Sequence, residues 1–138
     1  MRKVFTKLLA GAMLVSTLAI SASAASVATE NFYVRINGGS VLSSQVATKS
    51  GTGMMWAAVD KMAGSNINWL PSEIVNYRGR APSGANATVL GQTTQPTGTK
   101  HLGYLSGYGD VGSSYKMAVQ YDNNNPYTHL ELTVSWMP

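Results

Sequence analysis

The residues of this chain that could carry acid–base chemistry are few and widely spaced. Its 138 residues include two histidines, six acidic residues and no cysteine. A Ser-His-Asp site needs a histidine base beside a serine and an orienting carboxylate, and the segment Gly103–Gly107 lacks the G-x-S-x-G spacing of a nucleophile elbow. The absence of cysteine excludes thiol catalysis and thiolate zinc sites. We therefore expect a protein that is not an enzyme, with no catalytic residues, no metal site and no cofactor.

A glycine-rich segment has the spacing of a nucleotide-binding loop. Residues Gly107–Gly112 spell G-x-G-x-x-G, a pattern that binds a dinucleotide only where it follows a strand and opens a helix. Here it leads into an alternating, strand-like segment, so we interpret it as a glycine-rich turn. Tyr104, Tyr108 and Asp110 lie among these glycines. Tyrosine offers a rigid apolar face with a polar tip, and glycine lets a partner approach the backbone. These three residues are our candidate binding loop; the alternative is a sheet corner without a ligand.

Two arginines, Arg78 and Arg80, flank Gly79 just after a predicted strand. A pair of guanidinium groups can hold a phosphate or a carboxylate. The more common interpretation of such a pair is a charged turn exposed to solvent.

Strand signals are strongest at the end of the chain. Apolar and polar residues alternate from Ser114 to Asp122 and again from Thr128 to Trp136, which predicts two strands that each bury one face. Asn123–Pro126, between them, are turn-forming residues. We therefore predict that these two strands form a hairpin.

The rest of the chain shows shorter strand signals separated by turns about every ten residues. This spacing predicts an all-β fold, a small antiparallel β-sandwich of about six to eight strands. Met54–Met62 fits a strand, although Met55, Val59 and Met62 also match a helical stripe. The other predicted strands are Phe32–Ile36, Ile67–Leu70, Ile74–Arg78 and Ala87–Leu90, while Ala25–Glu30 is expected to be loose and Gly91–Lys100 to be a loop. Most of the large side chains Met54, Met55, Trp56, Trp69 and Trp136 are expected in the core.

The first residues have the pattern of an export signal. Arg2, Lys3 and Lys7 precede a largely apolar, 13-residue run from Leu8 to Ile20, and Ala22-Ser23-Ala24 follows. This predicts a signal peptide over residues 1–24 and a single secreted domain over 25–138. A permanent membrane helix needs roughly 20 apolar residues, so we expect no stable membrane anchor. An uncleaved leader is the alternative.

The composition of the predicted domain excludes one class of partner. Three of the ten basic residues lie in the leader, whereas all six acidic residues follow it. The remaining net charge of +1 does not favour nucleic acid, because electrostatic binding needs clustered excess charge. A secreted domain without disulfides must be held together by packing alone, and export without cysteine is typical of Gram-positive bacteria.

The end of the chain also resembles a group of known proteins. The segments GSSYKMA from Gly112 and LTVSWMP from Leu132 resemble the ends of small secreted, cysteine-free β-proteins of Gram-positive bacteria. The resemblance implies a leader and a C-terminal hairpin, and it carries over no functional residue. A more distant similarity is to lactococcin 972-like bacteriocins, although this chain is longer and poorer in histidine.

Two functions follow from these observations. The favoured one is a secreted, non-catalytic β-domain that binds an extracellular or cell-envelope partner, either a cell-wall polymer or an extracellular protein. The alternative is an antimicrobial, bacteriocin-like protein that acts on competing cells.

Overall fold

The chain folds into two antiparallel sheets. The computed structural model describes residues 26–35, 39–62, 74–94, 97–122 and 129–138, and these contain nine strands and no helix. The first sheet has the order β1 (Ala28–Arg35), β9 (His129–Met137), β4 (Met55–Lys61), β7 (Lys100–Leu102). The second sheet has the order β2 (Val41–Leu42), β8 (Ser114–Asp122), β5 (Ile74–Arg80), β6 (Gly91–Thr93), and β3 (Ala47–Thr48) also pairs with β8. The predicted all-β class is confirmed. The predicted strand number was too low because β2 and β3 are only two residues long.

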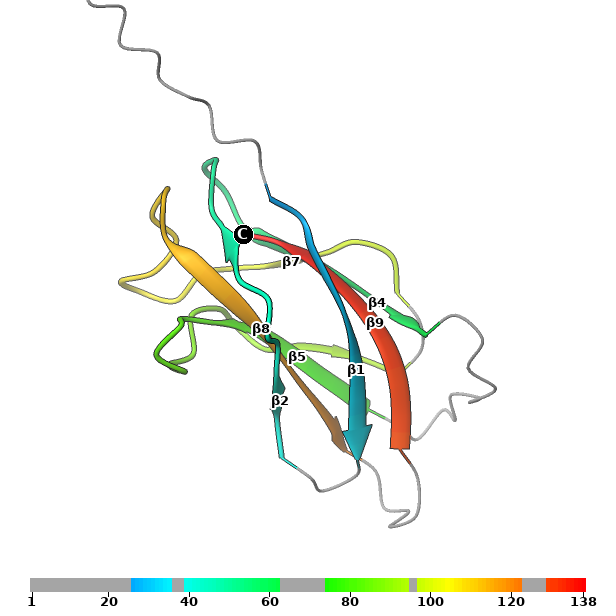
Figure 1. The fold of residues 1–138 in the computed structure, drawn as a ribbon. Helices are drawn as coiled ribbons and strands as arrows, with labels where there is room; N and C mark the ends of the chain where they lie inside the picture. Colours follow the sequence, from blue (N-terminus) through cyan, green and yellow to red (C-terminus); the bar gives the residue numbers. More distant parts are fainter. Residues whose placement is uncertain (1–25, 36–38, 63–73, 95–96, 123–128) are drawn as a thin grey trace, which may run out of the picture.

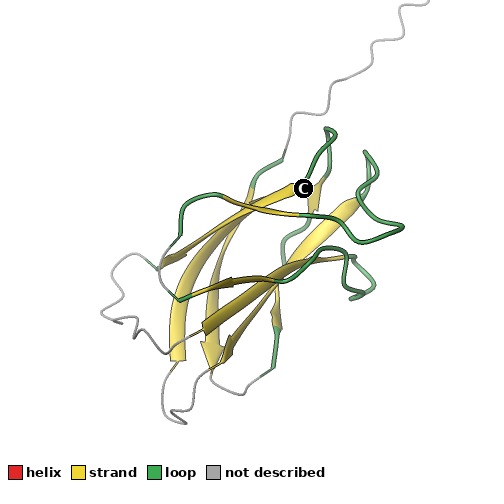
Figure 2. Ribbon diagram, turned by 180° about the vertical axis from the view of Figure 1, so that it is seen from behind, coloured by secondary structure: helices red, strands yellow, loops and turns green. Residues whose placement is uncertain are grey.

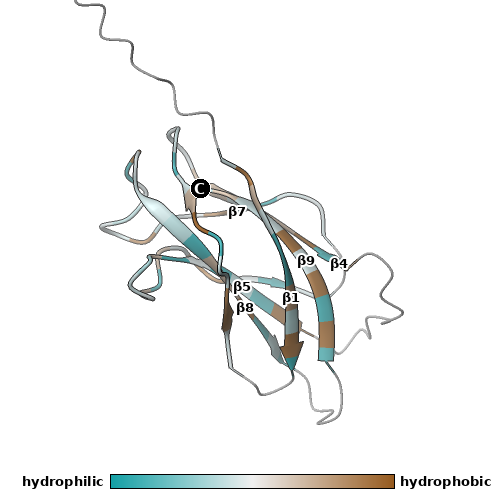
Figure 3. Ribbon diagram, viewed as in Figure 1, coloured by the Kyte–Doolittle hydropathy of each residue, from teal (hydrophilic) through white to brown (hydrophobic). Residues whose placement is uncertain are grey.

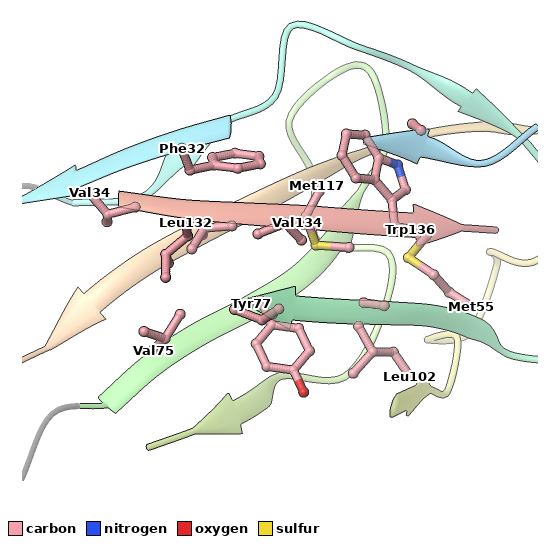
Figure 4. Close-up of a cluster of buried hydrophobic side chains, with 14 of the residues drawn as sticks. Phe32, Val34, Met55, Val75, Tyr77, Leu102, Met117, Leu132, Val134 and Trp136 are labelled. Carbon is pink, nitrogen blue, oxygen red and sulfur yellow. The ribbon is translucent and has the colours of Figure 1, made fainter. Parts of the chain in front are cut away.

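The two sheets face each other across one apolar core (Figures 1 and 2). Val34, Val134 and Trp136 from the first sheet and Val75 and Met117 from the second are fully buried there (Figure 4). Burying one such side chain contributes roughly 1.5–3 kcal/mol, so the core can hold the sheets together without disulfides.

The predicted terminal strands exist, but they do not form a hairpin. Leu130, Leu132, Val134 and Trp136 point inward from β9, and brown and teal bands alternate along this strand in Figure 3. However, β9 pairs with β1 and β4, whereas β8 pairs with β2, β3 and β5. The hairpin prediction was wrong because alternation identifies a buried face without identifying the neighbouring strand. Both strands are central in their own sheets, and their apolar faces meet across the core.

The beginning of the predicted domain is more ordered than the sequence suggested. Phe32 and Val34 are buried in β1 while Tyr33 and Arg35 are exposed, as predicted. The strand already starts at Ala28, and residues 28–30 pair with residues 134–136. The expectation that these residues are loose was wrong because β9 supplies backbone partners for a polar segment.

Two other predicted strands are confirmed. Met55–Lys61 is a strand, with Met55, Ala57 and Val59 buried at every second position, so the helical alternative is excluded. Strand β5 begins at Ile74 as predicted but continues to Arg80. The predicted strand Ile67–Leu70, Trp69 and the turn Asn123–Pro126 lie outside the described residues.

The segment between β5 and β8 was predicted less well. Ala87–Leu90 is not a strand; Thr88 forms only an isolated bridge to Tyr104. The predicted loop 91–100 instead contains β6 and the start of β7. These short, polar strands pair through their backbones at sheet edges, so they have no apolar alternation that a sequence reading could detect.

The large side chains divide between the core and the surface. Trp136 and Met55 are fully buried as expected, whereas Met54 is 61% exposed. No helix in the described ranges is long and apolar enough to cross a membrane. The predicted signal peptide lies outside these ranges.

Candidate functional site

Most of the aromatic surface of the candidate binding loop is directed into the protein. The Tyr104 ring lies 5.2 Å from the Tyr115 ring, centroid to centroid, and both Tyr104 and Tyr108 pack against the core. Burial raises the pKa of the Tyr104 hydroxyl, with a smaller contribution from Tyr115. Asp110 is exposed. A ligand of this loop would therefore meet the carboxylate of Asp110 more readily than the face of Tyr104.

A buried lysine fixes this loop to the rest of the protein. Lys49 is only 2% exposed, its Nζ donates to the carbonyl oxygen of Gly53 over 2.8 Å, and Nζ lies 4.6 Å from the centroid of the Tyr104 ring. Its backbone is bonded to Gly112 and Ser113. Burial lowers the pKa of the Lys49 ammonium. The cation–π contact and these hydrogen bonds give the tyrosine side of the loop a structural role.

The G-x-G-x-x-G segment forms turns, as interpreted from the sequence. Gly107, Gly109 and Gly112 all have positive φ, and the segment runs into β8 rather than a helix. At Gly109 a Cβ would lie 2.9 Å from the Tyr104 ring, and the Gly109 amide donates to the Tyr115 hydroxyl over 2.7 Å. The glycine allows the backbone to approach these two rings.

A polar groove lies on the outer face of the second sheet, and we call it the arginine groove. Its volume is about 260 Å³. Its lining comes from β5, from β8 and from the segments before β2 and β6, and it includes Asn76, Arg78, Arg80, Ala118, Gln120, Leu90 and Ser40. Figure 1 shows β5 and β8 side by side in this sheet.

The alternation of β5 produces the groove. Val75 and Tyr77 point into the core, so Asn76, Arg78 and Arg80 share the opposite face. Gly79 is required on the inner side, where a Cβ would lie 2.6 Å from Met55 Cε and 2.9 Å from Thr88 Cγ2. The charged-turn interpretation of the two arginines was therefore wrong: both are within a strand that continues beyond the predicted end.

One end of the groove holds a network of amide and carboxylate side chains. Gln92 Nε2 donates to Asn76 Oδ1 over 2.8 Å, and the Asn76 amide donates in turn to Asp122. Gln120 Nε2 donates to the other oxygen of Asp122 over 3.2 Å. These contacts join three neighbouring strands and occupy both carboxylate oxygens of Asp122.

The arginine end has more donors than acceptors. Arg80 donates from one terminal nitrogen to Ser40 Oγ over 3.2 Å, while its buried Nε has no hydrogen-bond partner. Among the described residues no carboxylate forms an ion pair with Arg78 or Arg80. Lys116 is the cross-strand neighbour of Arg80 on the same face, and like charges placed opposite each other on adjacent strands are destabilising. This end can accommodate an anion.

The sequence contained a partial signal for this site. The order Val75, Asn76, Tyr77, Arg78 alternates in the same manner as a half-buried strand, and extending it to Arg80 would have placed both arginines on one face. The partners from β8 and β6 could not be predicted, because they depend on strand order and register.

The two histidines lie apart from the groove, in the first sheet. His101 is exposed on β7, opposite Trp56, and His129 stacks on Tyr33 with ring centroids 4.3 Å apart. His129 Nε2 lies 3.6 Å from Glu131 Oε1. Within the described part of the chain, no three His, Asp or Glu side chains gather as a metal site would need.

Comparison with known proteins adds no relative to this picture. No family model matches the chain, and neither the curated proteins nor the solved structures contain a match.

Proposed function

We propose that this chain is a secreted, non-catalytic β-domain that binds a partner outside the cell or on the cell envelope, and that the arginine groove is its binding surface. The observation that carries the proposal is that Arg78 and Arg80 share a hollowed sheet face without a carboxylate partner among the described residues. The leader-like residues 1–24 support secretion.

The groove is favoured over the candidate binding loop because more of its polar side-chain groups are available to bind a ligand. Two tyrosines of the loop pack against the core, whereas the arginines project from a central strand held by β8 and β6. Binding groups on a rigid strand are positioned more precisely than those on a loop. Asp110 remains the residue of the loop that is best placed to contribute.

Co-sedimentation with purified Gram-positive cell walls tests this function. The full chain is expected to sediment with the walls in a saturable manner and to be competed by soluble wall polymer. Asp110→Asn tests the loop without disturbing its packing, and we expect it to alter sedimentation less than a change in the groove. A folded chain that stays in the supernatant at every wall concentration would contradict the proposal.

Secretion and removal of the leader are tested separately. Expression in a Gram-positive host is expected to release protein into the medium with Ala25 as its first residue, as read by N-terminal sequencing or mass spectrometry. Protein that stays in the cell with residues 1–24 attached would contradict this part of the proposal.

One observation favours the antimicrobial alternative. Of the large apolar side chains that the structure describes, Met54 and Val111 are the two most exposed, at 61% and 58%. Their loops are joined by the hydrogen bond from the Gly112 amide to the Lys49 carbonyl, and both project at one end of the sandwich (Figures 1 and 2). Exposed apolar side chains can contact a membrane or a partner. Growth inhibition of related species that is lost in Met54→Ser/Val111→Ser would support this function, and no inhibition by the purified protein would remove it.

A further inference from the structure

From the arrangement of the groove we infer that its ligand is a hydroxylated, anionic polymer, in which a phosphate or carboxylate group binds Arg78 and Arg80 and neighbouring hydroxyls bind the amide end. This inference rests on the proposed function, since it names the ligand class of the same site.

The charge distribution along the groove determines which end the anionic group of the ligand occupies. Arg78, Arg80 and the neighbouring Lys116 bring three positive charges to one end of the outer face. The negative charge of Asp122 lies at the other end, bonded to Asn76 and Gln120. An anionic group is therefore attracted to the arginine end and repelled by the Asp122 end.

The arginine end selects an oxyanion rather than a neutral group. A guanidinium has five donors and no acceptor, and Ser40 Oγ is the acceptor that the described residues offer to Arg80. Phosphate and carboxylate oxygens accept paired hydrogen bonds from arginine and supply the opposite charge. They would also relieve the repulsion between Arg80 and Lys116.

The amide end selects hydroxyl groups. Gln120 lines the groove beside Asn76, and its side chain's single hydrogen bond among the described residues, to Asp122, leaves its carbonyl oxygen and a second N–H group for a ligand. Gln92, which donates to Asn76, is the next residue across the sheet on β6. A hydroxyl can donate and accept at once, so it matches mixed amide groups better than a second anion does. Ala118 and Leu90 provide a small apolar area between the two ends.

The dimensions favour one repeat unit of a chain. Arg78 and Asn76 are two residues apart on a strand, which places their Cα atoms roughly 7 Å apart. A sugar or polyol unit with one oxyanion spans a similar length, and a volume of about 260 Å³ holds one such unit. The groove is open to solvent, so the bound unit can be part of a longer chain. Polyol phosphates and uronic-acid polymers both have this chemistry.

The test titrates two probes into the unchanged chain and into two variants. A glycerol-phosphate oligomer and a galacturonate oligomer are titrated into the full chain, its Arg78→Gln/Arg80→Gln variant, and Arg35→Gln as a control that removes one positive charge from the other sheet. Arg35 is exposed on the opposite sheet and packs its guanidinium over Tyr33, so its loss changes the net charge without changing the groove. Unfolding midpoints verify that all the proteins are folded.

We expect at least one oligomer to bind the unchanged chain. The double variant should weaken binding by about tenfold or more, because each arginine loses a charge-assisted hydrogen bond, and Arg35→Gln should change it by less than about twofold. Binding of the phosphate oligomer alone or the carboxylate oligomer alone identifies the source of the oxyanion. Equal loss in Arg35→Gln, or equal binding of neutral dextran or of poly-glutamate, would overturn the inference.

Wall sedimentation of the same variants separates the two proposals. If the unchanged chain sediments, the Arg78→Gln/Arg80→Gln variant does not, and neither oligomer binds, the proposed function stands and the ligand class is wrong. If both proteins sediment equally well, binding at the cell envelope stands but the groove is not the surface that binds. If the unchanged chain does not sediment, the proposed function itself fails.

Discussion

The outer faces of the two sheets carry similar polar residues but use them differently. On the first sheet Tyr33 stacks on His129, His129 lies beside Glu131, and the Arg35 guanidinium lies 5.9 Å from the Tyr33 ring centroid. Further along this face, Thr29 and Ser135 share a hydrogen bond of 2.8 Å, as do Thr133 and Asn31. Most of these side chains therefore have partners within their own face.

The second sheet has such partners at one end only. Its amide residues bond to one another and to Asp122, while the arginines face a groove with little to accept their hydrogen bonds. Side chains that already bond to one another gain few hydrogen bonds when a ligand binds. Arginine donors without a partner gain both hydrogen bonds and an opposite charge. This difference supports the proposal that the second face is the binding surface. The following changes test which contacts support that face.

The largest effect is expected at the inner side of the arginine strand. Gly79→Val would push side-chain atoms into Met55 and Thr88, which lie 2.6 and 2.9 Å from the first added carbon. Overpacking of this kind costs about 3 kcal/mol at its upper range, and it should also displace the two arginines. Urea unfolding measures the stability and oligomer titration measures the binding.

Gly103→Val is the matched control for this change. A Cβ at Gly103 meets nothing within 4 Å, so we expect a much smaller loss of stability. Equal losses in the two variants would show that the close packing of β5 against Met55 does not support the groove.

A somewhat smaller effect is expected when the support from Thr88 is removed. Thr88 is fully buried, and its Oγ1 accepts a hydrogen bond of 2.9 Å from the Gly79 amide. In Thr88→Val this buried donor loses its partner, which costs about 2 kcal/mol. The control on the other outer face is Thr29→Val, where the exposed hydroxyl bond to Ser135 is replaced at a cost of about 0.5 kcal/mol or less. Similar unfolding midpoints for both variants would show that the loss of the buried hydrogen bond costs no more than the loss of the exposed one.

Alkaline pH is expected to weaken the fold beneath the groove. Burial raises the pKa of Tyr77, which lies under the groove, and of Tyr104. Above the unfolded pKa of about 10 the unfolded chain loses phenolic protons that the folded chain keeps, so the free energy of unfolding falls with pH. At pH 11 the loss is at most about 1.4 kcal/mol per phenol.

Lys49 has the opposite pH dependence. Its pKa is lowered in the folded state, so between that value and about 10.5 the unfolded chain binds more protons and stability rises with pH. Urea unfolding from pH 7 to 11 should therefore show a rise that ends near pH 10 and a fall beyond it. Tyr104→Phe should reduce the fall, and an unchanged fall in this variant would assign it to other groups.

The prediction from sequence succeeded where burial alone determines local structure. The strands with a strongly alternating apolar face, β1, β4, β8 and β9, could be found because every second side chain enters the core. Alternation does not encode a strand's partner, so the sheet membership of β8 and β9 was missed. Strands β6 and β7 were missed because they are short, polar and paired through their backbones.

The candidate site, too, was predicted from the sequence only in part. The sequence identified Arg78 and Arg80 as a pair that could hold an anion, but it placed them in a turn. Their convergence with Gln92 and Gln120 depends on the register of three strands, which no local pattern contains. Tyr104 was selected for its chemistry, and its burial against Tyr115 and Lys49 is likewise a long-range property.

The smallest effect is expected on the self-satisfied face of the first sheet. His129 Nε2 and Glu131 Oε1 are 3.6 Å apart, with side chains 37% and 28% exposed. Solvent screens such a pair, so Glu131→Gln should change the free energy of unfolding by no more than about 0.5 kcal/mol. It should also leave oligomer binding unchanged, because the pair lies on the opposite sheet from the groove. A clear loss of binding in Glu131→Gln, with the unfolding midpoint unchanged, would show that the first face takes part in recognition. Contacts between side chains of the same face would then not distinguish the two surfaces.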